Sequence, residues 1–277
     1  MTFITREMNE NEIHYAIDAA AKEGWNPGIN DGKCFYQTDP YGFFVSEMAG
    51  EIAGCISAVA YQETYGFIGF FIVDEKYRAS NIGMALGMRA MKYLGQRIIG
   101  IDGVVERVGN YRNLGFELAH RNVRFEGVGG GVRPDGLTDL NEIPFESLAD
   151  YDARHFPVRR ERFLRCWIDM PNAIGYAVKS GDKIDGYGVI RSCRTGYKIG
   201  PLFANDEHIG RQIFAGLISK ADGQPYYFDI PEPNEGAQRI VKDHKMQQVF
   251  ETSRMYKNGM PDLPIDNIFS ITSFELG

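Results

Sequence analysis

Residues 69–86, GFFIVDEKYRASNIGMAL, decide the fold of this chain. An apolar strand ends at Val73, a polar turn contains Arg78, and a helix begins near Ile82. A strand that leads through small residues into a helix N-terminus offers backbone amides and the positive end of the helix dipole to an anion. The pattern R-x-x-N-x-G over 78–83 therefore predicts an anion-binding loop. The alternative is a surface loop that only caps a core helix.

The elements on either side of this stretch alternate between helical and strand-like patterns. Helical spacing of apolar residues predicts a helix over 10–24, and the run 66–73 is apolar throughout, as in a central strand buried on both faces. The other elements that we expect before residue 126 are strands at 43–48, 52–61, 98–101 and 123–125, a helix at 82–97 and a short helix before Leu114-Gly115-Phe116.

The second half of the chain repeats the pattern of the first. Segments 42–45, 50–54 and 65–69 are echoed by segments 175–178, 181–186 and 195–200, at an offset of about 131 residues. We interpret this as two copies of one αβ unit, against chance similarity among strands flanked by glycine. Glycines and a proline over 127–136 mark the boundary. The predicted division is 1–126, a linker over 127–138, and 139–277.

Composition narrows the classes of partner. The formal net charge of −7 disfavours a nucleic-acid partner, which would require a basic face. The N-terminus is polar and no apolar run approaches 18 residues, so we expect neither a signal peptide nor a membrane span, and a cytoplasmic protein. The four cysteines are widely spaced without a CxxC motif, which predicts free thiols and no metal site.

Arg78 and Gly83 match a known motif. The loop resembles the diphosphate-binding motif [QR]-x-x-G-x-[GA] of the GCN5-related N-acetyltransferase (GNAT) family, with Asn81 in place of a glycine. Asparagine tolerates a positive φ angle better than other non-glycine residues, which makes the change acceptable. The segment 111–116, YRNLGF, also fits the family's Y-x-x-x-G-F pattern, and the order of the elements is the family's order. The resemblance implies an α/β fold with a mixed sheet in two tandem copies.

The resemblance also implies a site for an acyl-coenzyme A, with acetyl-coenzyme A as the expected cosubstrate. The end of the central strand would pair with the pantetheine and polarise the thioester carbonyl, and the loop would hold the diphosphate. The implied cofactor-binding residues are Phe71, Ile72, Val73, Arg78, Ala79, Ser80, Asn81, Ile82, Gly83, Met84 and Asn110. Asn110 enters as a replacement for the family's usual Asn, because Val104 occupies that position.

Tyr111 stands where the family places the residue that protonates the departing thiolate. The alternative is an aromatic side chain that only packs ahead of Gly-Phe. The general base is open among Glu63, Tyr65 and Asp102, although Glu63 also fits a solvated loop and Asp102-Gly103 also fits a turn. Asp229 and Arg191 are weaker candidates for an interdomain cleft, and no histidine shows a partner pattern.

The second copy lacks the loop. Its segment 202–210 is shorter, has no arginine and carries Asp206 and Glu207 where phosphates would lie. We expect one cofactor site per chain, with the C-terminal copy forming either a wall of the acceptor pocket or a structural cover.

The favoured function is an N-acyltransferase that acts on a primary amine of a small molecule or peptide, by direct attack in a ternary complex. The alternatives are a non-catalytic acyl-coenzyme A-binding or sensory protein and a transferase that uses aminoacyl-transfer RNA, which the acidic charge disfavours. We expect a monomer or homodimer.

Overall fold

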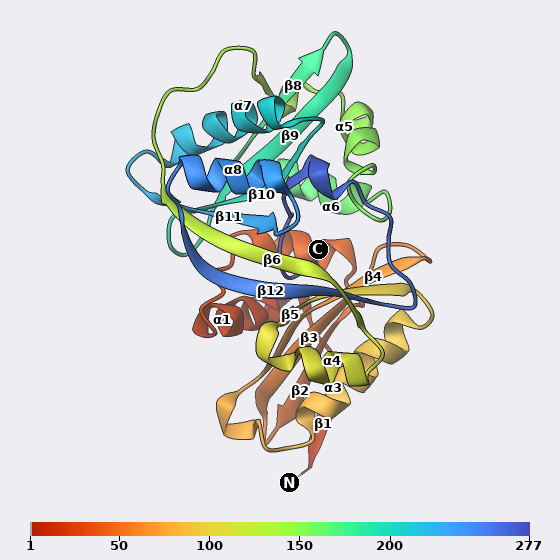
Figure 1. The fold of residues 1–277 in the computed structure, drawn as a ribbon. Helices are drawn as coiled ribbons and strands as arrows, with labels where there is room; N and C mark the ends of the chain where they lie inside the picture. Colours follow the sequence, from red (N-terminus) through yellow and green to blue (C-terminus); the bar gives the residue numbers. More distant parts are fainter. Residues whose placement is uncertain (1) are drawn as a thin grey trace.

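The computed structural model describes residues 2–277. Two lobes meet across a layer that includes helices from both of them, and a pair of long strands joins the lobes (Figure 1). The first lobe holds β1 (Phe3–Glu7), α1 (Ile13–Lys22), α2 (Asp31–Thr38), β2 (Phe43–Met48), β3 (Glu51–Ala60), β4 (Tyr65–Val73), α3 (Ile82–Leu94), β5 (Ile98–Val104) and α4 (Val108–Asn113). The second lobe holds β7 (Thr138–Asp139), α5 (Phe145–Asp152), α6 (Glu161–Ile168), β8 (Ala173–Ser180), β9 (Lys183–Ser192), β10 (Tyr197–Ala204), α7 (Glu207–Ile218), β11 (Pro225–Pro231), α8 (Glu235–Asp243) and β13 (Ile268–Ser270).

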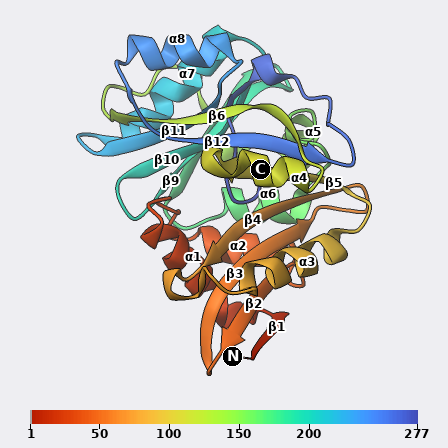
Figure 2. The same cartoon turned by 60° about the horizontal axis from the view of Figure 1, so that its bottom comes forward.

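The joining strands are β6 (Glu117–Val128) and β12 (Gln247–Lys257). All strands form one mixed sheet with the order β1-β2-β3-β4-β5-β12-β6-β11-β10-β9-β8-β7, in which β13 pairs with β10. Thus β12, from late in the chain, pairs with β5, and β6 pairs with β11. Each lobe borrows a strand from the other, as the turned view also shows (Figure 2). The predicted mixed α/β fold is confirmed, but the sheet is continuous and does not form two separate sheets.

Three apolar cores hold these layers together. One lies between α3 and the first lobe's strands, and one lies between α7, α8 and the second lobe's strands. The third fills the space between the lobes and includes buried side chains from α1, α2, α5 and α6. Because this central core spans both halves of the chain, the lobes pack as one body with apolar burial as the main stabilising term.

Buried ion pairs repeat across the joining strands. Arg254 of β12 pairs with Asp102 of β5, and Arg124 of β6 pairs with Asp229 of β11, at 2.6 and 2.7 Å. Each arginine lies opposite its aspartate in the strand register. The two pairs are therefore equivalent under an approximate two-fold relation between the halves.

Cys34 and Cys166 form a disulfide between α2 and α6, with their Cα atoms 5.3 Å apart. The prediction of free thiols is wrong for these two residues and holds for Cys55 and Cys193. The sequence separation of 132 residues is close to the repeat offset. Equivalent helices meet where the two halves face each other, which brings cysteines that are distant in the sequence together.

Chemical labelling checks this bond. We expect the chain, denatured without reductant and treated with a thiol-alkylating reagent, to carry labels on Cys55 and Cys193 only. Reduction before alkylation should add labels on Cys34 and Cys166. Labels on all four residues without reduction, found by peptide mass spectrometry, would show that the disulfide does not form.

Candidate active site

An opening forms where β4 and β5 part. The two strands pair in parallel from Tyr65 with Ile98 to Ile68 with Ile101, and no pairing continues beyond Ile68 although β4 runs on to Val73. A bulge in the β3–β4 ladder follows at once, and Phe70 there has a positive φ of 47°. Such backbone strain in a bulky residue is concentrated at functional sites. The bulge turns the end of β4 away from β5 and leaves one of its backbone edges unpaired.

The predicted loop follows β4 directly. A short 3-10 turn over Glu75–Tyr77 is capped by the side chain of Asp74, and α3 begins at Ile82 as expected. The Arg78 guanidinium folds back, where its Nε donates to the Val73 carbonyl at 3.1 Å and its Nη2 pairs with Glu23 of the segment after α1. Asn81 has a φ of −82°, so the glycine of the family motif is not needed here for a positive φ. Asn81 therefore fits this position without strain.

The N-terminus of α3 is open. Asn81 makes no side-chain cap, and the amides of Gly83 and Met84 have no backbone acceptor within residues 2–277. Amides at this position of a helix have no partner within the helix. In α7, by contrast, the Asp206 side chain accepts from the Ile209 amide at 2.9 Å. Of these two equivalent ends, α3 has free donors and no acidic residue in its first turn, so it is the end suited to an anion.

Gly83 leaves room over this end. A Cβ atom added at Gly83 would come no closer than 3.6 Å to the side chain of Val73 and 3.7 Å to that of Phe71. The protein's own atoms therefore do not require glycine here. Phe71, Met84 and Met88 are exposed apolar side chains, with 41%, 66% and 68% of their surfaces accessible. The open amides thus adjoin an apolar surface of the kind that a ligand covers.

Tyr111 lies across the opening, on the side of β5. Its ring packs against Gly103, where an added Cβ would come within 2.3 Å of the ring, and edge-on to Phe116 at 6.5 Å between centroids. Its hydroxyl has no hydrogen-bond partner in the described chain. Burial raises the pKa of Tyr111, and nearby Arg107 opposes that shift. The phenol therefore stays protonated at neutral pH. Asn110, one residue earlier, is exposed.

Asp102 is not free to act as a base. Its carboxylate accepts from Arg254 at 2.9 and 2.6 Å and from Asn122 at 2.8 Å, and its side chain has no exposed surface. These donors hold the carboxylate inside an ion pair that joins β5 to β12. The alternative of a simple turn is wrong because Asp102 lies within β5, and the assignment of Asp102 as the base stays a prediction that the ion pair disfavours.

An Asp102→Asn variant is expected to lose about 3 kcal/mol of unfolding free energy, because it leaves the Arg254 charge buried without its partner. Chemical denaturation measures this change, and Glu63→Gln provides an exposed control that should leave stability unaltered. Unchanged stability with lost turnover would return Asp102 to the catalytic candidates.

Glu63 and the backbone of Tyr65 lie at the N-terminal end of β4, whereas the opening lies toward its C-terminal end. Glu63 is exposed in the β3–β4 turn, where the Thr64 carbonyl accepts from the Ile98 amide. The strand from Tyr65 to Gly69 spans about 13 Å and separates Glu63 from the opening. Tyr65 is buried, burial raises its pKa well above the usual value, and its hydroxyl lies against Gly100 of β5. The assignment of Glu63 or Tyr65 as the base stays a prediction.

Asp229 and Arg191 face the interior as predicted, but both are paired. Asp229 binds Arg124, and Arg191 binds Asp31 of α2 at 2.8 Å. They hold the lobes together and are not available to a ligand.

The equivalent opening in the second lobe is filled. The parallel pairing of β10 and β11 ends at Ile199 with Phe228, and β13 then pairs with β10 at Leu202. The Ser270 hydroxyl donates to the carbonyls of Ile199 or Asp229, each at 3.1 Å. The chain's own C-terminal segment thus occupies the place that remains open between β4 and β5. The residues after Ser270 form no strand, although the segment is buried to residue 277.

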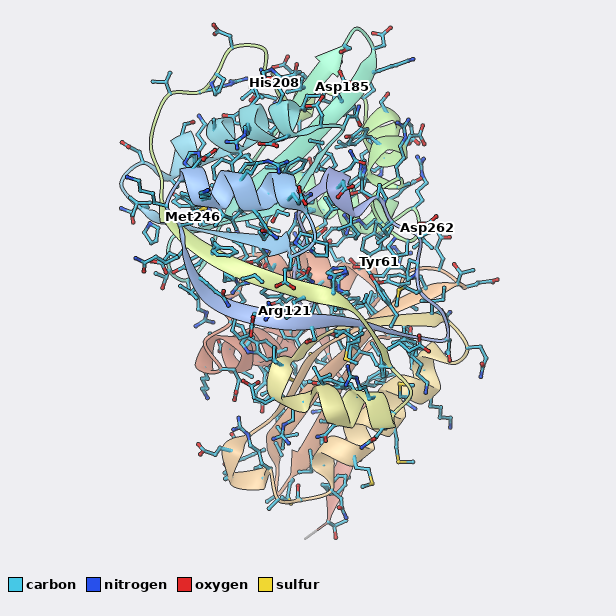
Figure 3. All side chains as sticks on the ribbon, viewed as in Figure 1. Tyr61, Arg121, Asp185, His208, Met246 and Asp262 are labelled. Atoms are coloured by element: carbon cyan, nitrogen blue, oxygen red, sulfur yellow. A yellow bond between two sulfur atoms is a disulfide. The ribbon has the colours of Figure 1, made fainter. Side chains whose placement is uncertain are left out.

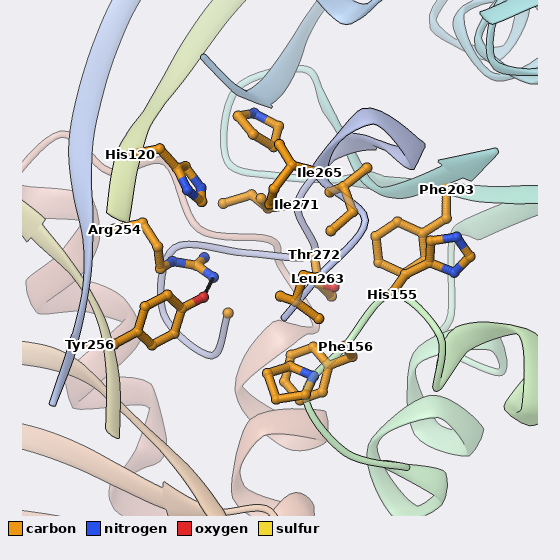
Figure 4. Close-up of a pocket in the computed structure, with 14 residues that line it drawn as sticks. His120, His155, Phe156, Phe203, Arg254, Tyr256, Leu263, Ile265, Ile271 and Thr272 are labelled. Carbon is orange, nitrogen blue, oxygen red and sulfur yellow. Dashed lines mark hydrogen bonds between the residues drawn. The ribbon is translucent and has the colours of Figure 1, made fainter. Parts of the chain in front are cut away.

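A cavity lies between the lobes beside β6 and β12. His120, Arg254 and Tyr256 line one side, and His155 and Phe203 line the other (Figure 4). Burial, with a smaller effect of Arg254, lowers the pKa of His120 to about 4, so the imidazole is neutral at physiological pH. No cluster that could hold a metal ion occurs within residues 2–277, and none of the helices there is long and apolar enough to cross a membrane.

Sequence reasoning missed the buried polar residues that face this interior. Lys198, Glu275 and Asn122 are each less than 3% exposed, and they come from β10, the C-terminal segment and β6. Their sequence contexts carry no motif, and only the exchange of strands between the lobes brings them together.

Comparisons with known proteins agree with this geometry. Residues 10–116 match the model of the acetyltransferase (GNAT) family, and residues 148–270 match that of an acetyltransferase (GNAT) domain. A holothin acyltransferase from Pseudoalteromonas sp. (strain SANK 73390) is 26% identical over all of this chain and 95% of its own length. Among solved structures, a protein described as an acetyltransferase from Pyrococcus horikoshii is similar with a TM-score of 0.86 and 21% identity, over 99% of this chain and 96% of that one. A tandem GNAT protein from the clavulanic acid biosynthesis pathway has a TM-score of 0.65 and 11% identity, over 94% of this chain and all of its own.

Proposed function

Because this chain belongs to the GNAT family and is an acyltransferase, we propose that it transfers an acetyl group from acetyl-coenzyme A to a primary amine. The observation that carries the proposal is the pair of free amides of Gly83 and Met84 in the first turn of α3, next to the Ile82 amide that donates to Ser80 Oγ and beside the opening between β4 and β5. Two equivalent units exist in the chain, and only this one has both free amides and an open strand edge.

The diphosphate lies on the loop from Arg78 to Met84 in this proposal. The amides of Gly83 and Met84 donate to it, and the space above Gly83 admits it close to the backbone. The Arg78 side chain is half exposed and pairs with Glu23. When the diphosphate binds, Arg78 either exchanges Glu23 for the diphosphate or keeps the Glu23 charge away from it. Of the remaining loop residues, Ala79, Ser80 and Asn81 are small, and the Ile82 side chain is buried beneath the helix.

The pantetheine and thioester then enter the opening. Phe71, Ile72 and Val73 offer the unpaired edge of β4 to the pantetheine amides, and Asn110 lies beside the outer part of this path. Backbone donors at the bulge polarise the thioester carbonyl as negative charge develops on its oxygen. Tyr111 protonates the departing sulfur, because its hydroxyl is unpaired and its raised pKa keeps it protonated.

The acceptor reaches the thioester from the central core, on the face of β4 opposite α3. The second lobe and the C-terminal segment form the wall on this side. The division into residues 1–126, a linker over 127–138, and residues 139–277 remains our proposal for the two repeat units, although β6 ends at Val128 and each lobe takes a strand from the other. The full-length similarity to a holothin acyltransferase favours a small-molecule acceptor over a peptide.

Amine-dependent release of free thiol from acetyl-coenzyme A tests the proposal. We expect turnover with at least one member of a panel of alkylamines, polyamines, amino acids and aminosugars, and an acetylated product by mass spectrometry. Cofactor binding by calorimetry without thiol release across the panel would favour a non-catalytic acyl-coenzyme A-binding protein instead.

A further inference from the structure

Glu275 is fixed beside the opening on the acceptor side. The C-terminal segment that carries it lies on β4, where an added Cβ at Gly69 would come within 2.1 Å of the Glu275 carbonyl oxygen. The Tyr61 hydroxyl donates to the Leu276 carbonyl at 3.1 Å, and Tyr61 lies at the junction of the lobes (Figure 3). Gly69 comes one residue before Phe70 in the bulge that turns β4 away from β5. The Glu275 backbone is therefore held next to the place where a thioester enters, and its carboxylate faces Arg124 and Lys198.

The Glu275 carboxylate has no donor of its own. The residue is 2% exposed, and neither oxygen has a hydrogen-bond partner in the described chain. A buried carboxylate without donors is unfavourable by several kcal/mol, on the order of the desolvation cost of a polar group. Such a group in a native fold calls for a donor that comes from outside the chain.

The charged neighbours of Glu275 do not supply that donor. The positive charges that face it are Arg124 of β6 and Lys198 of β10, and the Asp229 carboxylate of β11 lies beside them. Arg124 donates to Asp229 at 2.7 Å and to the Trp25 carbonyl at 2.7 Å. Lys198 lies 3.5 Å from the same carbonyl, and burial lowers its pKa to about 8. Neither cation hydrogen-bonds to Glu275, so both of its carboxylate oxygens stay free in the described chain.

We propose that Glu275 binds the ammonium group of the acceptor and takes its first proton. The inference rests on the proposed acetyl transfer and deepens it, since it assigns the substrate class as an amine that is protonated in solution. An ammonium group provides three N–H donors, which suits two unpaired carboxylate oxygens.

The protons balance in this scheme. Glu275 accepts one proton from the ammonium group, and the freed lone pair attacks the thioester carbonyl carbon to form the C–N bond. When the C–S bond breaks, Tyr111 gives its proton to the sulfur and regains one from the nitrogen of the new amide. Glu275 then releases its proton to solvent, so the net products are the amide, the thiol of coenzyme A and one proton.

Glu275→Gln tests this role because it keeps the shape and removes the base. Benzylamine, protonated at neutral pH, and aniline, uncharged at neutral pH, serve as the probes. We expect kcat/KM with benzylamine to fall about 100-fold or more, and with aniline about tenfold or less, since aniline needs no prior deprotonation. The affinity for acetyl-coenzyme A, measured by calorimetry, should change by less than about twofold.

The controls separate this role from a structural one. Asp182→Asn removes an exposed carboxylate from the turn between β8 and β9 and should leave both rates unaltered. Glu275→Asp keeps the charge on a shorter side chain and should keep the wild-type ratio of the two rates, which tests the proposal even if Glu275→Gln fails to fold. An equal loss with both amines, or a benzylamine rate within about threefold of wild type in Glu275→Gln, would overturn it.

Failure of the underlying function looks different. If the wild-type protein binds acetyl-coenzyme A but acetylates neither probe, the substrate class assigned to Glu275 is wrong and the cofactor site stands. If it does not bind acetyl-coenzyme A at all, the proposed function itself is wrong.

Discussion

A Gly83→Glu variant is expected to bind acetyl-coenzyme A at least about 100-fold more weakly than wild type, a loss of about 3 kcal/mol in binding free energy. The new side chain fills the space above the first turn of α3, and its carboxylate repels the diphosphate that the free amides would hold. Calorimetric titration measures the affinity directly.

The same change should not harm the fold. Glutamate is a better helix former than glycine, and a carboxylate near a helix N-terminus is favourable by about 0.3–1 kcal/mol. The unfolding free energy should therefore stay equal or rise, while the affinity for acetyl-coenzyme A falls. Lys92→Glu adds a carboxylate to the last turn of the same helix and should leave the affinity unchanged. An unaltered affinity in Gly83→Glu would remove the diphosphate from this loop.

Tyr111→Phe is expected to lower kcat by about 100-fold or more, the usual size of a general-acid contribution. Because the Tyr111 hydroxyl has no partner in the fold, its loss should leave the unfolding free energy and the affinity for acetyl-coenzyme A near their wild-type values. Steady-state kinetics with calorimetry as the companion measurement separates these quantities.

The pH dependence gives a second signature of Tyr111. An acid works in its protonated form, so its contribution is present below its pKa and is lost as the pH rises through it. Burial raises this pKa, which places the loss above the usual tyrosine value of about 10. Wild-type kcat should fall in that alkaline range, and Tyr111→Phe should lack the fall. Tyr41→Phe, an exposed tyrosine away from the opening, should behave as wild type. If Tyr111→Phe turns over at the wild-type rate, Tyr111 only packs against Gly103 and is not the acid.

Local sequence patterns predicted the elements whose signals are local. The apolar run before Val73, the loop and the start of α3 at Ile82 all follow from strand and helix periodicity. Helix α3 ends at Leu94 and not at residue 97, because Gly95 adopts a positive φ of 61° and stops it. The helix α2 was not predicted, because a polar run with glycine and aspartate around Asp31 reads as a loop until α6 packs against it.

The exchange of β6 and β12 lay outside the reach of the sequence. Strand pairing over more than 100 residues has no local signal, and so the ion pair of Asp102 and the polar surroundings of Glu275 remained hidden. One signal was available and unused. Cys34 and Cys166 are separated by almost the repeat offset, which in a tandem protein with a two-fold relation indicates that they can face each other.

A crystal structure with coenzyme A bound tests the central claim most directly. We expect one cofactor per chain. Its diphosphate should lie on the amides of Gly83 and Met84, and its thiol should lie between β4 and β5, near Tyr111 and Glu275. The equivalent place in the second lobe, which β13 fills, should hold no cofactor. A cofactor found at α7 and β10, or one that lies away from the first turn of α3, would contradict it.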